Sequence, residues 1–135
     1  MQNEDALVYA YLLDGKGSGK ALDWSDINTW EPDQGLLWLH LDSQNPEAQT
    51  WLETNSGIGQ LTCESLLEKE TRPRNILLSD GLLLILRGIN SNPGADPDDM
   101  VAIRILINEQ RIISMRYRRI KAVQNVQEAV DAGKG

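Results

Sequence analysis

The chain contains 135 residues, of which 41% are hydrophobic and 24% are charged, and its formal net charge is −7 at pH 7. These values are those of one soluble globular domain that buries its own core. No apolar stretch reaches the roughly 18 residues that a membrane-spanning helix needs, and the acidic balance argues against a nucleic-acid-binding module, which depends on net attraction to phosphate.

The distribution of charge and the cysteine content indicate what kind of surface the chain has and in which compartment it is found. Residues 1–70 carry thirteen acidic side chains against three lysines, a net charge of −10, whereas residues 71–135 carry ten basic side chains against seven acidic ones, a net charge of +3. Such asymmetry is typical of a partner surface or of two complementary faces. The single cysteine, Cys63, excludes an internal disulfide, and the acidic N-terminus does not resemble a signal peptide, so we expect a cytoplasmic chain.

The first part of the chain predicts strands joined by a short helical turn. Residues 6–13 have a β-forming composition and end at an Asp-Gly turn pair, which predicts the first strand. Residues 22–24 are expected to add a short edge strand, followed by a helical turn over residues 25–30 that Ser25 caps. The run 36–41 is apolar on both faces and predicts an interior strand.

Two helices are expected after this strand. Asn45 is followed by a proline, and a capping residue before a proline is a common helix start, so the first helix should run to about residue 55. The second is expected over residues 61–70, capped by Thr62. It must end before the proline at position 73, because the residue before a proline avoids helical angles.

The second half predicts two hairpins and a final helix. The strand at 82–89 begins with five consecutive apolar residues, which marks a strand covered on both faces, and it pairs with residues 75–78. Residues 101–107 and 111–117 form the second hairpin, and residues 120–132 an amphipathic helix. Strands that are apolar on both faces require helices above and below. The sequence therefore predicts a single α/β domain over the whole chain, with a sheet flanked by helices on both faces.

Few residues offer catalytic chemistry. His40 is the only histidine, and its place in an apolar strand favours a packed structural role over metal binding. A nucleophile pair of Cys63 and His40 would need an orienting third group and a pocket, and neither is evident. The glycine-rich residues 15–20 lack the hydroxyl residue of a phosphate-binding loop, because Ala21 stands in its place. We therefore expect no enzyme.

The densest carboxylate cluster lies in the turn-rich segment 90–99 and consists of Asp96, Asp98 and Asp99. Closely spaced carboxylates supply oxygen ligands for a hard cation, which makes these three residues the candidate metal ligands. No EF-hand pattern is present, and a solvated loop is the alternative interpretation.

Basic side chains gather late in the chain, and four tryptophans occur in its first half. The basic residues form either an anion or partner-subunit contact surface or salt bridges to the acidic half. The tryptophans fit core packing better than a base-stacking platform, since no basic residues interleave with them. The basic residues are Arg111, Arg116, Arg118, Arg119 and Lys121.

Short motifs follow one another along almost the whole chain. They are Trp-Leu-His-Leu-Asp at 38–42, Glu-Ser-Leu-Leu at 64–67 with Glu-Thr-Arg-Pro-Arg at 70–74, Leu-Ile-Leu-Arg-Gly-Ile-Asn at 84–90 with Pro-Gly-Ala-Asp-Pro at 93–97, and Arg104 with Ile-Ser at 113–114 and Arg-Tyr-Arg-Arg at 116–119. This ordered set resembles the N-terminal cytoplasmic domain of the ZntB-like zinc transporters, a branch of the CorA metal ion transporter family.

The resemblance implies an α/β/α sandwich with a mixed central sheet. It implies a homopentamer whose cytoplasmic funnel joins its own membrane domain at the bacterial inner membrane, and a full-length protein that moves Zn²⁺ or another divalent cation. In that family a stalk helix leads to two membrane helices and a Gly-Met-Asn motif. The sequence has none of these, so we expect a soluble fragment that cannot transport alone and holds no tight cofactor. A free-standing regulatory or scaffold module with this fold is the alternative.

Overall fold

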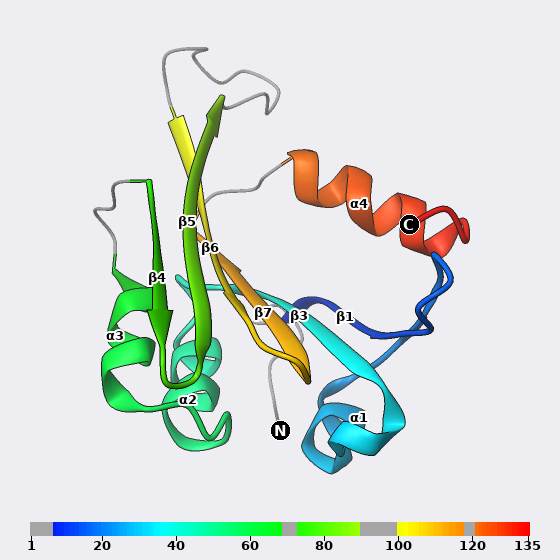
Figure 1. Cartoon of the computed structure of the whole chain (residues 1–135), viewed down its shortest axis with the longest axis horizontal. Helices are drawn as coiled ribbons and strands as arrows, with labels where there is room; N and C mark the ends of the chain where they lie inside the picture. Colours follow the sequence, from blue (N-terminus) through cyan, green and yellow to red (C-terminus); the bar gives the residue numbers. More distant parts are fainter. Residues whose placement is uncertain (1–6, 69–72, 90–99, 118–120) are drawn as a thin grey trace.

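The computed structural model describes residues 7–68, 73–89, 100–117 and 121–135. Within these ranges the chain forms a seven-stranded sheet, four α-helices and a 3₁₀ turn (Figure 1). The strands are β1 (Leu7–Leu13), β2 (Gly19–Ala21), β3 (Leu36–Asp42), β4 (Arg74–Leu78), β5 (Gly81–Ile89), β6 (Met100–Ile107) and β7 (Arg111–Arg116). The helices are α1 (Trp24–Thr29), α2 (Pro46–Thr54), α3 (Gln60–Leu67) and α4 (Lys121–Asp131), and the 3₁₀ turn is η2 (Pro32–Gln34).

The sheet is mixed, as the family resemblance implies. Its strand order is β2-β1-β3-β7-β6-β5-β4. Only the central pair β3 and β7 runs parallel, in register from Leu37 opposite Arg111 to Asp42 opposite Arg116, and the other neighbouring pairs are antiparallel. Parallel neighbours need a long crossover. Here α2, α3 and strands β4 to β6 supply it.

Alternation along β3 divides the core into two clusters. Leu37, Leu39 and Leu41 face α1, α2 and α3 and are buried with their apolar side chains. Trp38 lies on the opposite face, where Val123 and Val130 of α4 pack against it. Because successive strand residues point to opposite faces, α4 covers the face away from the other three helices. Figure 1 shows α4 standing apart from them.

The structure corrects the expectation for residues 22–25. The edge strand is β2, three residues earlier, because the turn after β1 is closed by Asp14, whose carboxylate accepts from the backbone N–H of Lys16 at 2.7 Å and of Ser18 at 3.1 Å. Lys20 then pairs with Leu12. Asp23, not Ser25, caps α1 by accepting from the Asp26 N–H at 2.9 Å.

The helix starts follow local hydrogen bonding. Asn45 caps α2 as predicted, accepting from the Glu47 N–H at 3.0 Å. The prediction for α3 was wrong at its start: Gly59 precedes the helix without a side-chain cap, and the Thr62 hydroxyl instead donates to Asp80 at 2.7 Å. No helix in the described part of the chain is long and apolar enough to cross a membrane.

Candidate functional site

One face of the sheet carries a broad apolar surface. On β5, Leu83 and Ile85 point toward α1, α2 and α3 and are fully buried, so Leu82, Leu84 and Leu86 point the other way. The register sets isoleucines of β6 opposite these leucines, in the pairs Leu82 with Ile107, Leu84 with Ile105 and Leu86 with Ile103. On the edge strand, Leu77 pairs with Leu82 and extends the surface. We call these seven residues the apolar sheet face.

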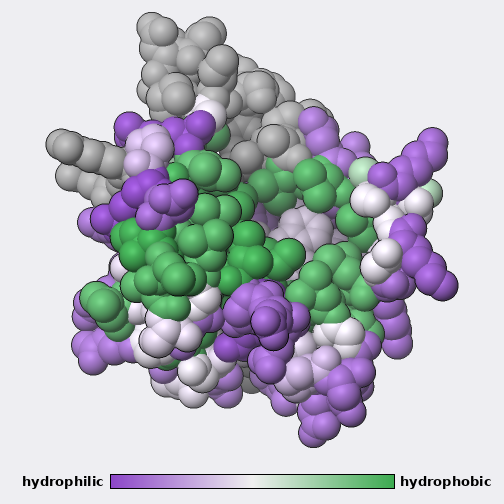
Figure 2. All heavy atoms as spheres, viewed as in Figure 1, coloured by the Kyte–Doolittle hydropathy of each residue, from purple (hydrophilic) through white to green (hydrophobic). Residues whose placement is uncertain are grey.

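The apolar sheet face is only partly covered. The exposed fraction is 82% at Leu77, 47% at Leu86 and 36% at Leu82. Figure 2 shows the apolar surface as a contiguous area over β4, β5 and β6. Contiguous exposed apolar surface is typical of places where another molecule or further polypeptide packs.

A buried polar cluster lies on the same side of the sheet, nearer to β1. His40 stands opposite Tyr9 of β1 and Ser114 of β7 in the register. The Ser114 hydroxyl lies 3.1 Å from Trp38 Nε1, 2.7 Å from His40 Nδ1 and 3.2 Å from the Leu39 carbonyl oxygen. The Tyr9 ring stacks on the imidazole, with centroids 5.9 Å apart.

One hydrogen arrangement satisfies all three contacts of Ser114. The hydroxyl oxygen accepts from Trp38 Nε1–H and from His40 Nδ1–H and donates to the Leu39 carbonyl. Burial lowers the pKa of His40 to about 3, and the positive charge of Arg116 acts in the same direction. The imidazole is therefore neutral and structural, as its sequence position predicted, and it is not an acid–base group near neutral pH.

A second candidate region is the groove between α2 and α3, with a volume of about 860 Å³. Glu53, Glu64 and Glu68 line it together with Leu61 and the buried thiol of Cys63. Burial, with the nearby carboxylates acting in the same direction, raises the pKa of Cys63, so the thiol stays protonated at neutral pH and is neither a nucleophile nor a ready metal ligand. The groove presents no built metal site among the described side chains.

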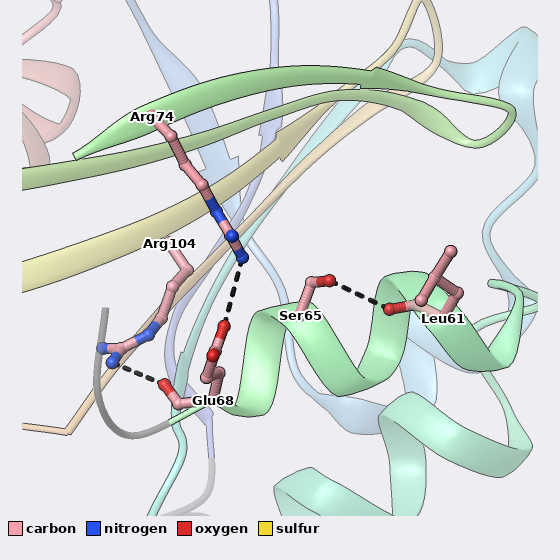
Figure 3. Close-up of polar contacts among 5 residues, drawn as sticks. All are labelled: Leu61, Ser65, Glu68, Arg74 and Arg104. Atoms are coloured by element: carbon pink, nitrogen blue, oxygen red, sulfur yellow. Dashed lines mark hydrogen bonds and ion pairs between the residues drawn. The ribbon is translucent and has the colours of Figure 1, made fainter. Parts of the chain in front are cut away.

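Two arginines hold the C-terminal end of α3 beside this groove. Arg104 is almost fully buried on β6 and donates to the Glu68 carbonyl oxygen at 2.6 Å. Arg74 of β4 forms an ion pair with the Glu68 carboxylate at 3.1 Å. Figure 3 shows both side chains converging on Glu68 from two strands. The guanidinium of Arg104 also stacks over Tyr117, 4.8 Å from the ring centroid. No pattern around Arg104 in the sequence predicts that it is a core residue.

The predicted basic cluster does not form one surface. Arg111 lies on the helical side of the sheet and donates to the Ser56 carbonyl oxygen, whereas Arg116, five positions later on the same strand, faces the opposite side. Arg118, Arg119 and the side chain of Lys121 lie outside the described residues. One ion pair between the basic and acidic halves is seen among the described side chains, that of Arg74 with Glu68.

The candidate metal ligands Asp96, Asp98 and Asp99 lie outside the described residues. Among the side chains that the structure describes, no three histidine, cysteine, aspartate or glutamate residues come close enough to hold a metal ion. The tryptophans pack as expected: three are buried in the two core clusters, and Trp30 is half-buried against the larger one.

Known proteins resemble the chain over almost its whole length. Residues 33–135 match the model of the family described as CorA-like Mg²⁺ transporter protein. The divalent cation transporter CmaX of Pseudomonas aeruginosa is 43% identical over 136 residues, which cover 98% of this chain and 41% of that protein. The zinc transport protein ZntB of Yersinia pseudotuberculosis is 36% identical over 136 residues, which cover 100% of this chain and 40% of that protein.

The fold agrees with the sequence matches. The crystal structure of the ZntB cytoplasmic domain from Vibrio parahaemolyticus has a TM-score of 0.77 and 30% identity, covering 96% of this chain and 51% of that one. The chain spans about two-fifths of the length of the two sequence relatives. These matches confirm the family and the mixed α/β fold that the sequence predicted. The chain belongs to the CorA-like Mg²⁺ transporter family.

Proposed function

We propose that the chain is part of the cytoplasmic domain of a divalent-cation transporter, with Zn²⁺ as the transported ion. The observation that carries this proposal is similarity over nearly the whole chain to CmaX and ZntB, both named as cation transporters. The family is one of transporters, and the structural role of His40 and the protonated state of Cys63 agree with a domain that has no catalytic role.

The apolar sheet face supports attachment to more polypeptide. The match to the Vibrio cytoplasmic domain covers about half of that chain, so a cytoplasmic domain of this kind contains roughly as much chain again. α4 packs on the side of the sheet that carries the apolar sheet face, and the chain reaches Gly135 just after it (Figure 1). Further chain of the transporter packs there and links the domain to a membrane part at the inner membrane.

The acidic charge supports a role in handling cations. Residues 7–68 contain ten acidic side chains and two lysines, so this part of the surface carries a negative potential that raises the local concentration of divalent cations. We infer a homopentamer in which five such domains line a cytoplasmic funnel and regulate the pore. A free-standing regulatory or scaffold module would instead be a stable monomer that needs no membrane partner.

Zinc flux tests the proposal. The protein encoded by the whole gene is reconstituted into liposomes that enclose a fluorescent zinc indicator, and liposomes holding only this chain serve as the control. We expect Zn²⁺ uptake with the whole protein and none with the control. Failure to move Zn²⁺ or other divalent cations, in protein shown to be folded and inserted, would reject the transport function.

The candidate loop ligands need a separate test. We propose that Asp96, Asp98 and Asp99 bind a divalent cation, since carboxylate oxygens are suitable ligands. Calorimetric titration of the chain with Zn²⁺ is compared between the wild type and a variant with all three changed to asparagine. A control variant changes the exposed Asp33 alone, Asp33→Asn, and should bind Zn²⁺ like the wild type. Unchanged heats in the triple variant would eliminate the loop as a site.

A further inference from the structure

A small pocket on the helical side of the sheet joins elements far apart in the sequence. It has a volume of about 280 Å³ and lies where β3 and β7 begin, beneath α1 and the end of α2. Its walls combine apolar and hydrogen-bonding side chains. Those that matter for its chemistry are Ile27, Trp30, Leu37, Trp51, Asn55 and Arg111.

Arg111 brings a half-buried positive charge to this pocket. Its guanidinium donates to the Ser56 carbonyl oxygen, just past the end of α2. The last carbonyls of that helix are otherwise satisfied, since Trp51 O accepts from the Asn55 and Ser56 N–H groups and Leu52 O from the Ser56 hydroxyl. A guanidinium has five N–H donors, so most of them remain available.

No ion pair joins Arg111 to a carboxylate among the described residues. Asp80 is the carboxylate that acts on it electrostatically. Its side chain is already engaged, because Oδ2 accepts from the Thr62 hydroxyl at 2.7 Å and from the Gly59 N–H at 3.2 Å. Burial lowers the pKa of Arg111, which is the direction for a cation removed from water without an adjacent anion.

Trp51 lines the same pocket, and its indole carries an unused donor that is buried in this structure. Its side chain is 5% exposed, and its indole Nε1–H has no hydrogen-bond acceptor. The neighbouring Trp30 differs, because its Nε1–H donates to the Gly35 carbonyl oxygen at 3.2 Å. Buried polar groups are normally paired, and an unpaired one in a pocket wall needs an explanation.

From these donors we propose that the pocket binds a carboxylate carried on a short apolar group. The carboxylate would accept from the Arg111 guanidinium and, once the ligand shifts the Trp51 ring enough to uncover it, from the buried Trp51 indole N–H. Ile27, Trp30 and Leu37 would contact the apolar part. The ligand is either a free small carboxylic acid or an acidic side chain from elsewhere in the transporter. This site is independent of ion transport, so each proposal can fail without the other.

The test follows the Trp51 indole resonance by ¹⁵N NMR while the chain is titrated with sodium butyrate. Sodium chloride at equal ionic strength and the neutral isostere butyramide are the controls. We expect a saturable shift with butyrate and none with butyramide, since the guanidinium recognises the charge. A shift that does not saturate, or an equal response to butyramide, would overturn the proposal.

Two variants locate the binding. Arg111→Gln should weaken butyrate binding at least roughly tenfold, because hydrogen bonds to charged groups are the strong ones. Arg74→Gln, which removes an arginine outside the pocket, should bind like the wild type. If Arg111→Gln does not fold, Trp51→Phe removes the indole donor and leaves an aromatic ring in its place. Butyrate binding to this variant is followed through the indole resonance of Trp30, which lines the same pocket, and it should also be weaker. Wild-type affinity in both pocket variants would refute the site.

The source of the carboxylate is separated by repeating the titration on the whole protein. A free carboxylic acid as the natural ligand predicts that butyrate shifts the resonance there as well. An acidic side chain of the transporter as the natural ligand predicts a resonance already at the bound position and no response to butyrate. Both results support carboxylate recognition, whereas an unbound position with no response to butyrate contradicts it.

Discussion

Removing the Ser114 hydroxyl should lower the free energy of unfolding by several kcal/mol. Ser114 is 2% exposed, His40 1% and Trp38 8%, so water cannot replace the lost oxygen. In Ser114→Ala, two buried donors, Trp38 Nε1–H and His40 Nδ1–H, lose their acceptor. Each unsatisfied buried donor costs about 1–3 kcal/mol, so two of them give a loss of about 2–6 kcal/mol. A typical domain has about 5–15 kcal/mol of stability in total.

Urea unfolding at pH 7, followed by tryptophan fluorescence and circular dichroism, measures this loss. Ser65→Ala is the matched control, because the Ser65 hydroxyl donates to the Leu61 carbonyl oxygen at 3.0 Å on the more accessible surface of α3 (Figure 3). We expect the control to stay within about 0.5 kcal/mol of the wild type. If Ser114→Ala is no less stable than Ser65→Ala, the Ser114 hydroxyl is not the essential acceptor of the Trp38 and His40 donors.

Three further results are expected. Because the pKa of His40 falls to about 3 on folding from about 6.5 in the unfolded chain, the unfolded state takes up a proton first, and stability should fall by up to about 1.4 kcal/mol per pH unit as the pH drops from 6.5 to 3. Urea midpoints across this range should decline less steeply in His40→Gln, and parallel declines would contradict a buried neutral imidazole. Leu77→Lys with Leu86→Lys should reduce self-association of the chain in sedimentation velocity and change its unfolding free energy by less than about 0.5 kcal/mol per site, because both side chains are exposed; undiminished association would exclude this face. Arg74→Ala should cost less than about 1 kcal/mol in the same unfolding assay, because the side chains of its ion pair with Glu68 are 41% and 47% exposed.

The order and type of the main elements could be predicted from the sequence. The two-sided apolar runs at 36–41 and 82–89 became β3 and β5, and the Asn-Pro pair at 45–46 marked the start of α2. Short elements were harder to place. β2 forms because it pairs with β1, and its own Gly-Lys-Ala sequence does not indicate a strand. Thr62 does not cap α3, because its hydroxyl donates to Asp80, 18 positions later in the chain.

Coverage of the sheet could be predicted only in part. Apolar residues on both faces of β5 predicted a strand covered on both sides. In this structure only one face is fully covered, because Leu83 is buried whereas Leu82 and Leu86 are exposed. The reason is that α4 packs over the part of the sheet nearer β1 and β7, away from β5. The apolar composition of a strand indicates that both of its faces should be buried, but it does not indicate which part of the chain packs on each face.

The functional residues were less predictable than the fold. His40 was correctly interpreted as structural because it stands in an apolar strand, although Ser114, its partner, lies 74 positions away. Arg111 and Arg116 are close in sequence but belong to opposite faces, a separation that strand parity fixes once the strand is known. The pocket of Trp51 and Arg111 unites residues from four elements, and no sequence spacing indicates that they meet.

The proposed transport function requires that this chain be one part of a longer membrane protein, and sequencing the gene beyond the codon for Gly135 tests this. We expect an open reading frame that continues through a long helical segment and two apolar spans of about 18 residues or more, with a Gly-Met-Asn motif. A stop codon immediately after Gly135 would contradict it, because no membrane part would then belong to the same polypeptide.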